Sequence, residues 1–195
     1  MKKLILSVVF ALALLTTPLF GNDFYGEESY QVPLGVSVGL TGNFGGCTGD
    51  CGEMYNPGGG IGLSIGYRPS LSFGVYAEVM KNFVHFAEGD YEDFNVSFIQ
   101  GNIGINFYLF PDQKFQPLLT AGFGNIHMSA EDDDGNEIGR TDEQQTVFFG
   151  FGGEYIISDN MTIPFKLQYA KVVINEDDLE KDSVWNILVG FNYYF

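Results

Sequence analysis

The chain has 195 residues, is rich in glycine (26) and in aromatic residues (19 Phe, 11 Tyr), and carries a formal net charge of −16. This length is sufficient for one domain with a sizeable buried surface. The strongly acidic balance excludes nucleic-acid binding through a basic patch.

The first segment has the three-part layout of a secretory signal peptide. Two lysines supply a basic start, the run Leu4–Leu15 is almost entirely apolar, and a plausible cleavage site follows Gly21. The run is shorter than the roughly 20 apolar residues of a membrane-spanning helix, and no other stretch approaches that length. We therefore predict a signal peptide at residues 1–21, a polar periplasmic lead at 22–32, and a mature chain without a transmembrane helix.

From residue 33 to residue 195, apolar residues alternate with small or polar ones. Val36, Val38 and Leu40, for example, are separated by Ser37 and Gly39. This period of two is typical of β-strands with two unlike faces, and no segment longer than two turns resembles a helix. The predicted strands are 34–41, 61–67, 73–85, 95–109, 117–129, 146–157, 162–173 and 183–195.

Short and long connections between these strands alternate along the chain. The three short ones are residues 68–70, 111–114 and 158–160, and the four long ones are 45–57, 86–93, 130–145 and 175–182. This order predicts an up-and-down antiparallel sheet with all long loops at one end. The long loops hold 18 of the 25 acidic residues and only two basic ones, so one rim is strongly acidic.

The two faces of the strands distinguish a soluble barrel from a membrane barrel. A soluble lipocalin-like barrel should show Lys, Glu, Arg and Gln freely on its outer face. Here the less apolar face is mainly Gly, Ser, Thr, Asn and Gln, which suits the narrow interior of eight strands. The other face is Val, Leu, Ile and Phe, with Tyr and Trp185 near the strand ends, as in lipid-facing walls with aromatic girdles. We therefore predict an all-β, eight-stranded transmembrane barrel.

The signal, the eight alternating strands, the long acidic loops and a terminal phenylalanine resemble the small outer-membrane β-barrels of Gram-negative bacteria. The resemblance is to the OmpA-type transmembrane domain and the OmpX type. It implies location in the cell outer membrane, contact with its lipid and lipopolysaccharide, and recognition by the outer-membrane assembly machinery. The alternate aromatics Phe191, Tyr193 and Phe195 match the C-terminal assembly signal of that family.

Charged residues occur at inward positions of the predicted barrel. Glu78, Glu154 and Lys166 share the inward parity of their strands, and Arg68 lies near a short turn. Because unpaired buried charges are costly, we expect these four residues to form a polar lumen network. A static salt-bridge plug is the favoured interpretation, and a gated ion path through the same residues is the alternative.

Two cysteines lie four positions apart in the first long loop. Cys47 and Cys51 enclose Thr-Gly-Asp, and the exported compartment is oxidising. A small loop disulfide is the predicted outcome. A metal site would need further ligands that are not evident nearby, so no firm metal site and no cofactor are predicted.

Two acidic clusters stand out in the later long loops. Their carboxylates are hard oxygen ligands that could bind Ca²⁺ or Mg²⁺ weakly and bridge to lipopolysaccharide, although a plain solvated acidic surface is the favoured interpretation. The candidate residues are Asp132, Asp133, Asp134, Glu176, Asp177 and Asp178.

The segment His127-Met128-Ser129 resembles the His and Ser pair of outer-membrane lipid A deacylases of the PagL type. In that family Asn follows the serine, whereas Ala130 follows here, and three strands come after the pair instead of one. We therefore predict no catalytic residues and no enzymatic activity. His127 and His85 are expected to be interface residues.

Three functions follow from these features. The leading prediction is a structural and surface-interaction barrel, adhesin-like, whose acidic extracellular loops meet a host or extracellular ligand. A narrow cation-preferring, porin-like channel is the alternative, and a lipid A-modifying enzyme is a distant third.

Overall fold

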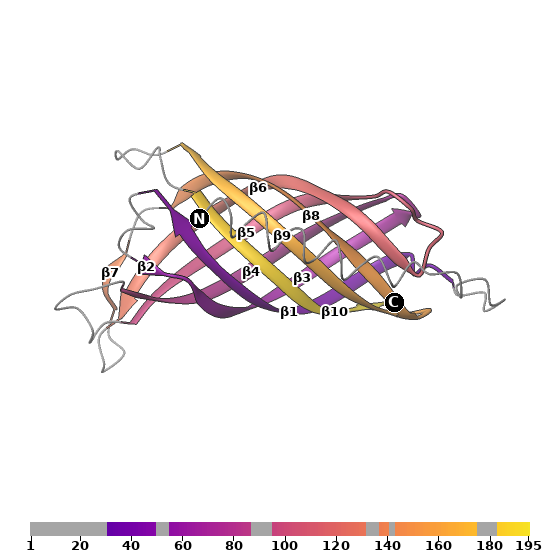
Figure 1. Ribbon diagram of the computed structural model, residues 1–195, viewed down its shortest axis with the longest axis horizontal. Coiled ribbons are helices and arrows are strands. Elements are labelled where there is room, and N and C mark those ends of the chain that lie inside the picture. The colour runs from indigo at the N-terminus through magenta and orange to yellow at the C-terminus, as the bar shows by residue number, and fades with distance from the viewer. Residues whose placement is uncertain (1–30, 50–54, 87–94, 132–136, 141–142, 175–182) are drawn as a thin grey trace, which may run out of the picture.

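The computed structural model describes residues 31–49, 55–86, 95–131, 137–140, 143–174 and 183–195, which form β-strands joined by turns (Figure 1). Within these ranges no helix has the length and hydropathy needed to cross a membrane. The strands are β1 (Gly35–Thr48), β2 (Tyr55–Asn56), β3 (Gly58–Ser70), β4 (Phe73–Phe86), β5 (Asn95–Tyr108), β6 (Phe115–Glu131), β7 (Glu137–Arg140), β8 (Gln144–Ser158), β9 (Met161–Ile174) and β10 (Ser183–Tyr194).

Eight long strands close into a barrel. Going round the wall, the order is β1, β3, β4, β5, β6, β8, β9 and β10, every pair is antiparallel, and β10 pairs with β1. The predicted eight-stranded up-and-down barrel is therefore confirmed. The short strands β2 and β7 pair with β4 and β6, and both lie at the left end of the barrel in Figure 1, opposite the C-terminus.

Several strand ends differ from the prediction. β1 continues to Thr48, which pairs with Ser183, although the sequence predicts a loop from residue 45. The glycines in this segment suggested a loop, but ladder hydrogen bonds use the backbone alone and need no side chain. The sequence predicts a turn at residues 68–70, but these residues form the end of β3. Proline is tolerated at this position, since at a strand end its missing N–H costs no central ladder hydrogen bond. The turn itself is Leu71–Ser72.

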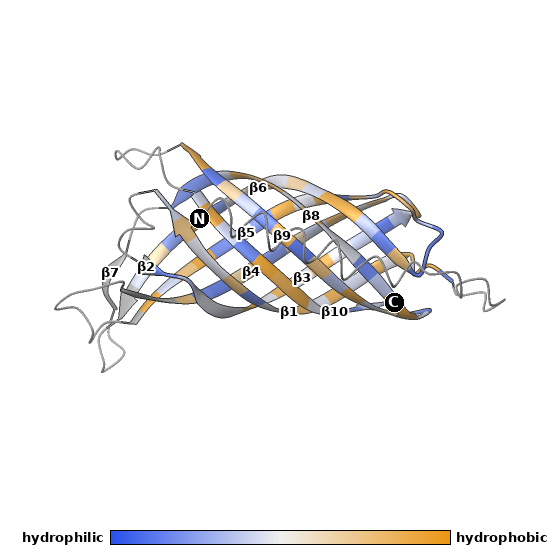
Figure 2. Cartoon of the chain, in the orientation of Figure 1, coloured by the Kyte–Doolittle hydropathy of each residue, from blue (hydrophilic) through white to orange (hydrophobic). Residues whose placement is uncertain are grey.

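The two faces of the barrel wall follow the predicted parity. Outward residues are apolar and strongly exposed, for example Ile103 at 72% and Phe123 at 73%, whereas the inward Gln116 and Thr162 are at 0%. Figure 2 shows hydrophobic and hydrophilic residues following one another along the strands. An apolar outer surface around a polar interior is the reverse of a soluble barrel and suits a lipid environment.

Candidate functional site

The short-turn end of the lumen is built around Glu154 on β8. Its Oε1 accepts three hydrogen bonds, from Thr162 Oγ1 at 2.5 Å, Asn192 Nδ2 at 2.9 Å and the Tyr194 hydroxyl at 3.1 Å. Its Oε2 lies 3.6 Å from Arg68 Nη1, an ion pair in which both side chains are 2% exposed. The carboxylate is thus held by neutral donors on one oxygen and by a cation on the other.

Arg68, near the end of β3, also donates to Gln116 on β6 and to two backbone carbonyls, one in its own strand and one in the following turn. Nη1 donates to Gln116 Oε1 at 2.8 Å, Nε donates to the Ser70 carbonyl at 3.3 Å, and Nη2 donates to the Leu71 carbonyl. The guanidinium also lies 3.6 Å above the centre of the Tyr108 ring. A planar guanidinium can serve all these partners at once, which a lysine could not.

A second ion pair occupies the middle of the barrel. Lys166 Nζ on β9 lies 4.0 Å from Glu78 Oε2 on β4 and 3.8 Å from the centre of the Tyr76 ring. The other carboxylate oxygen, Glu78 Oε1, accepts from Gln168 Nε2 at 2.8 Å and from Asn102 Nδ2 at 3.0 Å. Glu78, like Glu154, is thus held by neutral donors on one oxygen and by a cation on the other.

A chain of side-chain amides extends from Glu78 toward the long-loop end. Each amide nitrogen donates to the next oxygen, and the direction is constant, so every amide dipole has its positive end toward the carboxylate. Such aligned bonds strengthen one another. The order is Asn43 to Asn82, Asn82 to Asn186 at 2.5 Å, Asn186 to Gln100 at 3.0 Å, Gln100 to Asn102 at 3.1 Å, and Asn102 to Glu78.

Beyond the amides, apolar side chains fill the long-loop end of the lumen. This apolar plug consists of Cys47, Val96, Phe98, Ile126, Val172 and Val184, with Met128 packed against it. The strand pattern predicts a polar interior throughout, so this plug differs from the prediction. The signal was present, since alternation fades in Val172-Val173 and Val184-Trp185, where both faces are apolar.

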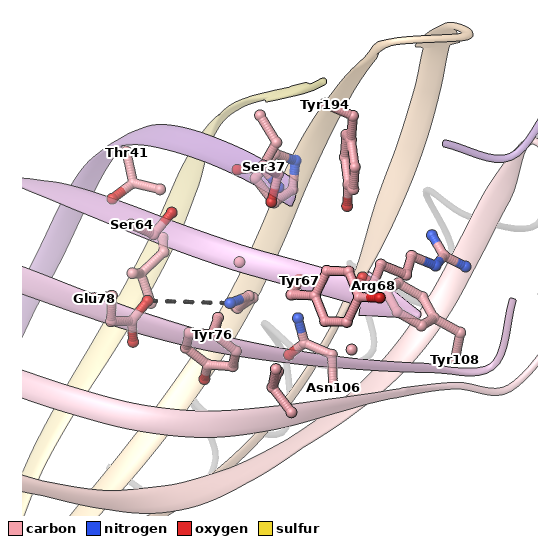
Figure 3. A pocket seen from close by; sticks show the side chains of 17 residues that line it. Ser37, Thr41, Ser64, Tyr67, Arg68, Tyr76, Glu78, Asn106, Tyr108 and Tyr194 are labelled. Atoms are coloured by element: carbon pink, nitrogen blue, oxygen red, sulfur yellow. Dashed lines mark ion pairs between the residues drawn. The ribbon is translucent and has the colours of Figure 1, made fainter. Parts of the chain in front are cut away.

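A cavity of about 40 Å³ lies between the two ion pairs, with room for a few water molecules. Figure 3 views it, with Glu78 and Tyr76 toward one side and Arg68 and Tyr108 toward the other. Its charged lining residues are Glu78, Arg68 and Lys166, and Glu154, which pairs with Arg68, lies outside the lining. Among the described residues, no group of His, Cys, Asp or Glu is arranged to hold a metal ion.

Replacing Lys166 by Ala is expected to lower the free energy of unfolding by about 1–3 kcal/mol. Glu78 would lose its cation but keep two amide donors, so the loss stays within the range for an incompletely compensated buried group. Urea titration of the barrel in lipid vesicles would measure it. A Lys114→Ala variant, which removes a lysine that is half-buried in a turn outside the lumen, is the control, and equal stability of both variants would contradict the lumen pairing.

Other predicted site residues lie elsewhere. Phe191, Tyr193 and Phe195 all face outward on or next to β10, and the Tyr193 and Phe195 rings meet at 5.1 Å; their role in assembly stays a prediction. Cys47 is 8% exposed within the apolar plug. Cys51, the acidic candidates 132–134 and 176–178, and the signal segment 1–21 lie outside the described residues, so the disulfide, cation and signal predictions stay untested.

The His127 and Ser129 pair occupies the long-loop half of β6. His127 is half-buried at an outward position, and Ser129 is 6% exposed. The backbone of His85 pairs with Asn56 in the short ladder between β4 and β2. The expectation that these histidines are interface residues stays a prediction.

Comparison with known proteins gives one family and one fold. The family model for the outer membrane protein beta-barrel domain matches residues 9–195. Neisserial surface protein A is similar in structure (TM-score 0.63, 14% identity, covering 82% of this chain and 97% of that chain). Ail of Yersinia pestis, solved with the heparin analogue sucrose octasulfate, has a TM-score of 0.58 at 14% identity, with 84% and 99% covered.

A third structural neighbour is the outer membrane protein OprG of Pseudomonas aeruginosa, with a TM-score of 0.54 and 14% identity over 86% of this chain and 99% of that chain. At such identities these likenesses establish the fold alone. No curated protein matches the sequence.

Proposed function

Since the chain belongs to the outer membrane protein β-barrel family and lies in the cell outer membrane, we propose that it is a surface-interaction scaffold, adhesin-like, whose acidic extracellular loops bind a cationic partner. The observation that carries this proposal is the filled lumen. Side chains occupy the barrel interior on both sides of the small cavity, from the Arg68–Glu154 pair to the apolar plug. Because a barrel with so little free interior offers no wide path for solutes, we expect it to act through its loops.

The sign of the partner follows from charge. The long loops carry 18 acidic residues and two basic ones, a field that attracts cations and repels anions. The Ail structure contains a polyanionic heparin analogue. For this chain we therefore propose a positively charged ligand, such as a basic peptide segment, and not a negatively charged sulfated sugar.

The proposal predicts salt-sensitive binding of a basic probe. The barrel in nanodiscs should bind a ten-residue oligolysine peptide at low salt and lose it as the Debye length falls to about 8 Å near 0.15 M salt. Asp177→Asn with Asp178→Asn should weaken binding about threefold, since exposed ion pairs contribute under about 1 kcal/mol each. Surface plasmon resonance would measure this.

The matched control is Asp112→Asn with Asp159→Asn, which removes two acids from the short-turn rim and should leave the affinity unchanged. Heparin is the probe of opposite charge and should not bind. Heparin binding, or equal effects of the two double variants, would contradict the proposed surface. Stable cation-selective steps in planar bilayers would favour the channel instead.

A further inference from the structure

A glycine leaves room beside a polar side chain in the wall of the lumen cavity. Gly74 on β4 pairs with Asn106 on β5, and both residues line the cavity. Opposed residues of neighbouring strands have their Cβ atoms about 4.5–5.5 Å apart, so a glycine at position 74 leaves the space next to Asn106 open. The sequence itself therefore provides the cavity at this point.

The ammonium of Lys166 is incompletely paired at the edge of this cavity. Its Nζ lies 4.0 Å from Glu78 Oε2, which exceeds hydrogen-bond distance, and 3.8 Å from the centre of the Tyr76 ring. A ring face attracts the cation but does not provide acceptors for its N–H donors. The Lys166 side chain is 11% exposed and lines the cavity, so an acceptor placed there can reach the ammonium.

The side-chain amide of Asn106 is also incompletely paired. Its Oδ1 is buried and has no hydrogen-bond partner among the residues that the structure describes. Figure 3 shows Asn106 among the side chains that surround the cavity, together with Tyr76 and Arg68. A half-turn about the last side-chain bond exchanges the amide oxygen and nitrogen, so Asn106 can offer either an acceptor or a donor to a molecule in the cavity.

Charge and polarity determine what can occupy the cavity. The lumen network holds two carboxylates, Glu78 and Glu154, and two cations, Arg68 and Lys166, so a further ion would be buried without a counter-charge. An apolar molecule would leave the ammonium and the amide unsolvated. The occupant must therefore be small, neutral and able both to accept and to donate hydrogen bonds.

Water meets these requirements. At roughly 10–15 Å³ for each molecule, the cavity of about 40 Å³ has room for about three water molecules. We propose that the cavity binds such a cluster, in which one water molecule accepts a hydrogen bond from Lys166 Nζ and bonds to the Asn106 amide. The hydroxyls of Ser37, Thr41 and Ser64, on β1 and β3, also line the cavity and serve the remaining molecules.

The cluster explains how a lysine keeps its charge inside the barrel. Glu78 and Lys166 at 4.0 Å form an ion pair that water completes, instead of a direct hydrogen-bonded pair. Side chains fill the lumen on both sides of the cavity, so the water is held in place and not conducted. The site is independent of the proposed loop surface, and either can fail alone.

The first test is magnetisation transfer from water to side-chain nitrogens, measured by solid-state NMR on the wild-type barrel in lipid bilayers. Lys166 Nζ and Asn106 Nδ2 should receive magnetisation several times faster than Asn186 Nδ2. Asn186 is the internal control, because it is 1% exposed and donates to Gln100 Oε1 at 3.0 Å within the amide chain. Transfer to Lys166 and Asn106 at the rate of Asn186 would overturn the site.

The second test fills the cavity with one methyl group. In Gly74→Ala the added Cβ would have the Tyr67 carbonyl oxygen at 3.6 Å as its nearest neighbour, which is ordinary contact. The methyl group should displace a hydrogen-bonded water molecule, so the variant should unfold at a lower urea concentration than Gly42→Ala, whose Cβ lies on the outer face. A cavity without water predicts the opposite order, because the methyl group would then fill a void, and that order would contradict the proposal.

An ion is the remaining alternative and has its own readout. The chemical shift of Lys166 Nζ should not change when gluconate replaces chloride in the buffer, and a change would indicate a bound anion in place of the water cluster. Heat-modifiable mobility on gels shows that each variant is folded before it is compared. The NMR measurement uses the wild-type chain, so it tests the site even if Gly74→Ala does not fold.

Discussion

Glu154→Ala is expected to lower the free energy of unfolding by about 3–5 kcal/mol, because it removes one partner of a buried ion pair. Arg68 would remain 2% exposed without its counter-charge. Thr162, Asn192 and Tyr194 would lose their shared acceptor at the same time. The effect should exceed that of Lys166→Ala, since removal of Glu154 takes away a counter-charge and also the acceptor of three side-chain hydrogen bonds.

The measurement is a guanidinium titration in lipid vesicles followed by fluorescence. The chain has one tryptophan, Trp185, which packs against Phe44 at 5.8 Å on the outer wall, so its emission reports transfer from lipid to water. Arg68→Met combined with Glu154→Met should recover part of the loss, because an apolar pair of similar volume leaves no buried charge. A Glu154→Ala barrel within about 1 kcal/mol of wild type would contradict the pairing.

The sequence was sufficient to predict the barrel because its signal is local. Alternation along each strand marks two faces, and the order of short and long connections makes the strands antiparallel neighbours. Strand ends were less predictable. Glycines such as Gly45 and Gly58 look like loop residues, yet they pair with each other across β1 and β3, a tertiary outcome that overrides local preference.

The sequence predicts which charged residues face the lumen, but not which of them form ion pairs with one another. Parity alone places Glu78, Glu154 and Lys166 inside. Which cation meets which carboxylate depends on the stagger between strands, which no single strand contains. Glu154 on β8 pairs with Arg68 on β3, and Lys166 on β9 pairs with Glu78 on β4. In both cases the two strands lie on opposite sides of the barrel wall. The amide chain, whose members come from four strands, could not be predicted for the same reason.

Inward glycines determine how closely the strands can approach. Gly152 on β8 pairs with Lys166 on β9 and lies beside the lumen network. A Cβ added there would lie under 3.0 Å from the Phe165 carbonyl oxygen and 2.8 Å from Lys166 Cα. These are backbone atoms of the neighbouring strand, so no side-chain rotation can relieve the clash, and the ladder between β8 and β9 would have to move.

Gly152→Ala is therefore expected to destabilise the barrel by at least about 3 kcal/mol, the upper end of the range for overpacking, or to prevent folding. Gly42→Ala is the matched control. Gly42 faces outward on β1, and an added Cβ would have the Val189 carbonyl oxygen at 3.9 Å as its nearest neighbour, which is ordinary contact. Because alanine loses less backbone entropy than glycine in a strand, Gly42→Ala should be neutral or stabilising by up to about 1 kcal/mol.

The two variants make the same chemical change on opposite faces of the wall, so their difference isolates the space inside the barrel. Folding into lipid vesicles, followed by Trp185 fluorescence and by heat-modifiable mobility, gives both the yield and the free energy of unfolding. If Gly152→Ala folds as well as Gly42→Ala, the strands are not held at the close spacing that the side-chain network requires. In that case the filled lumen, and the proposal that the barrel acts through its loops, would lose their structural support.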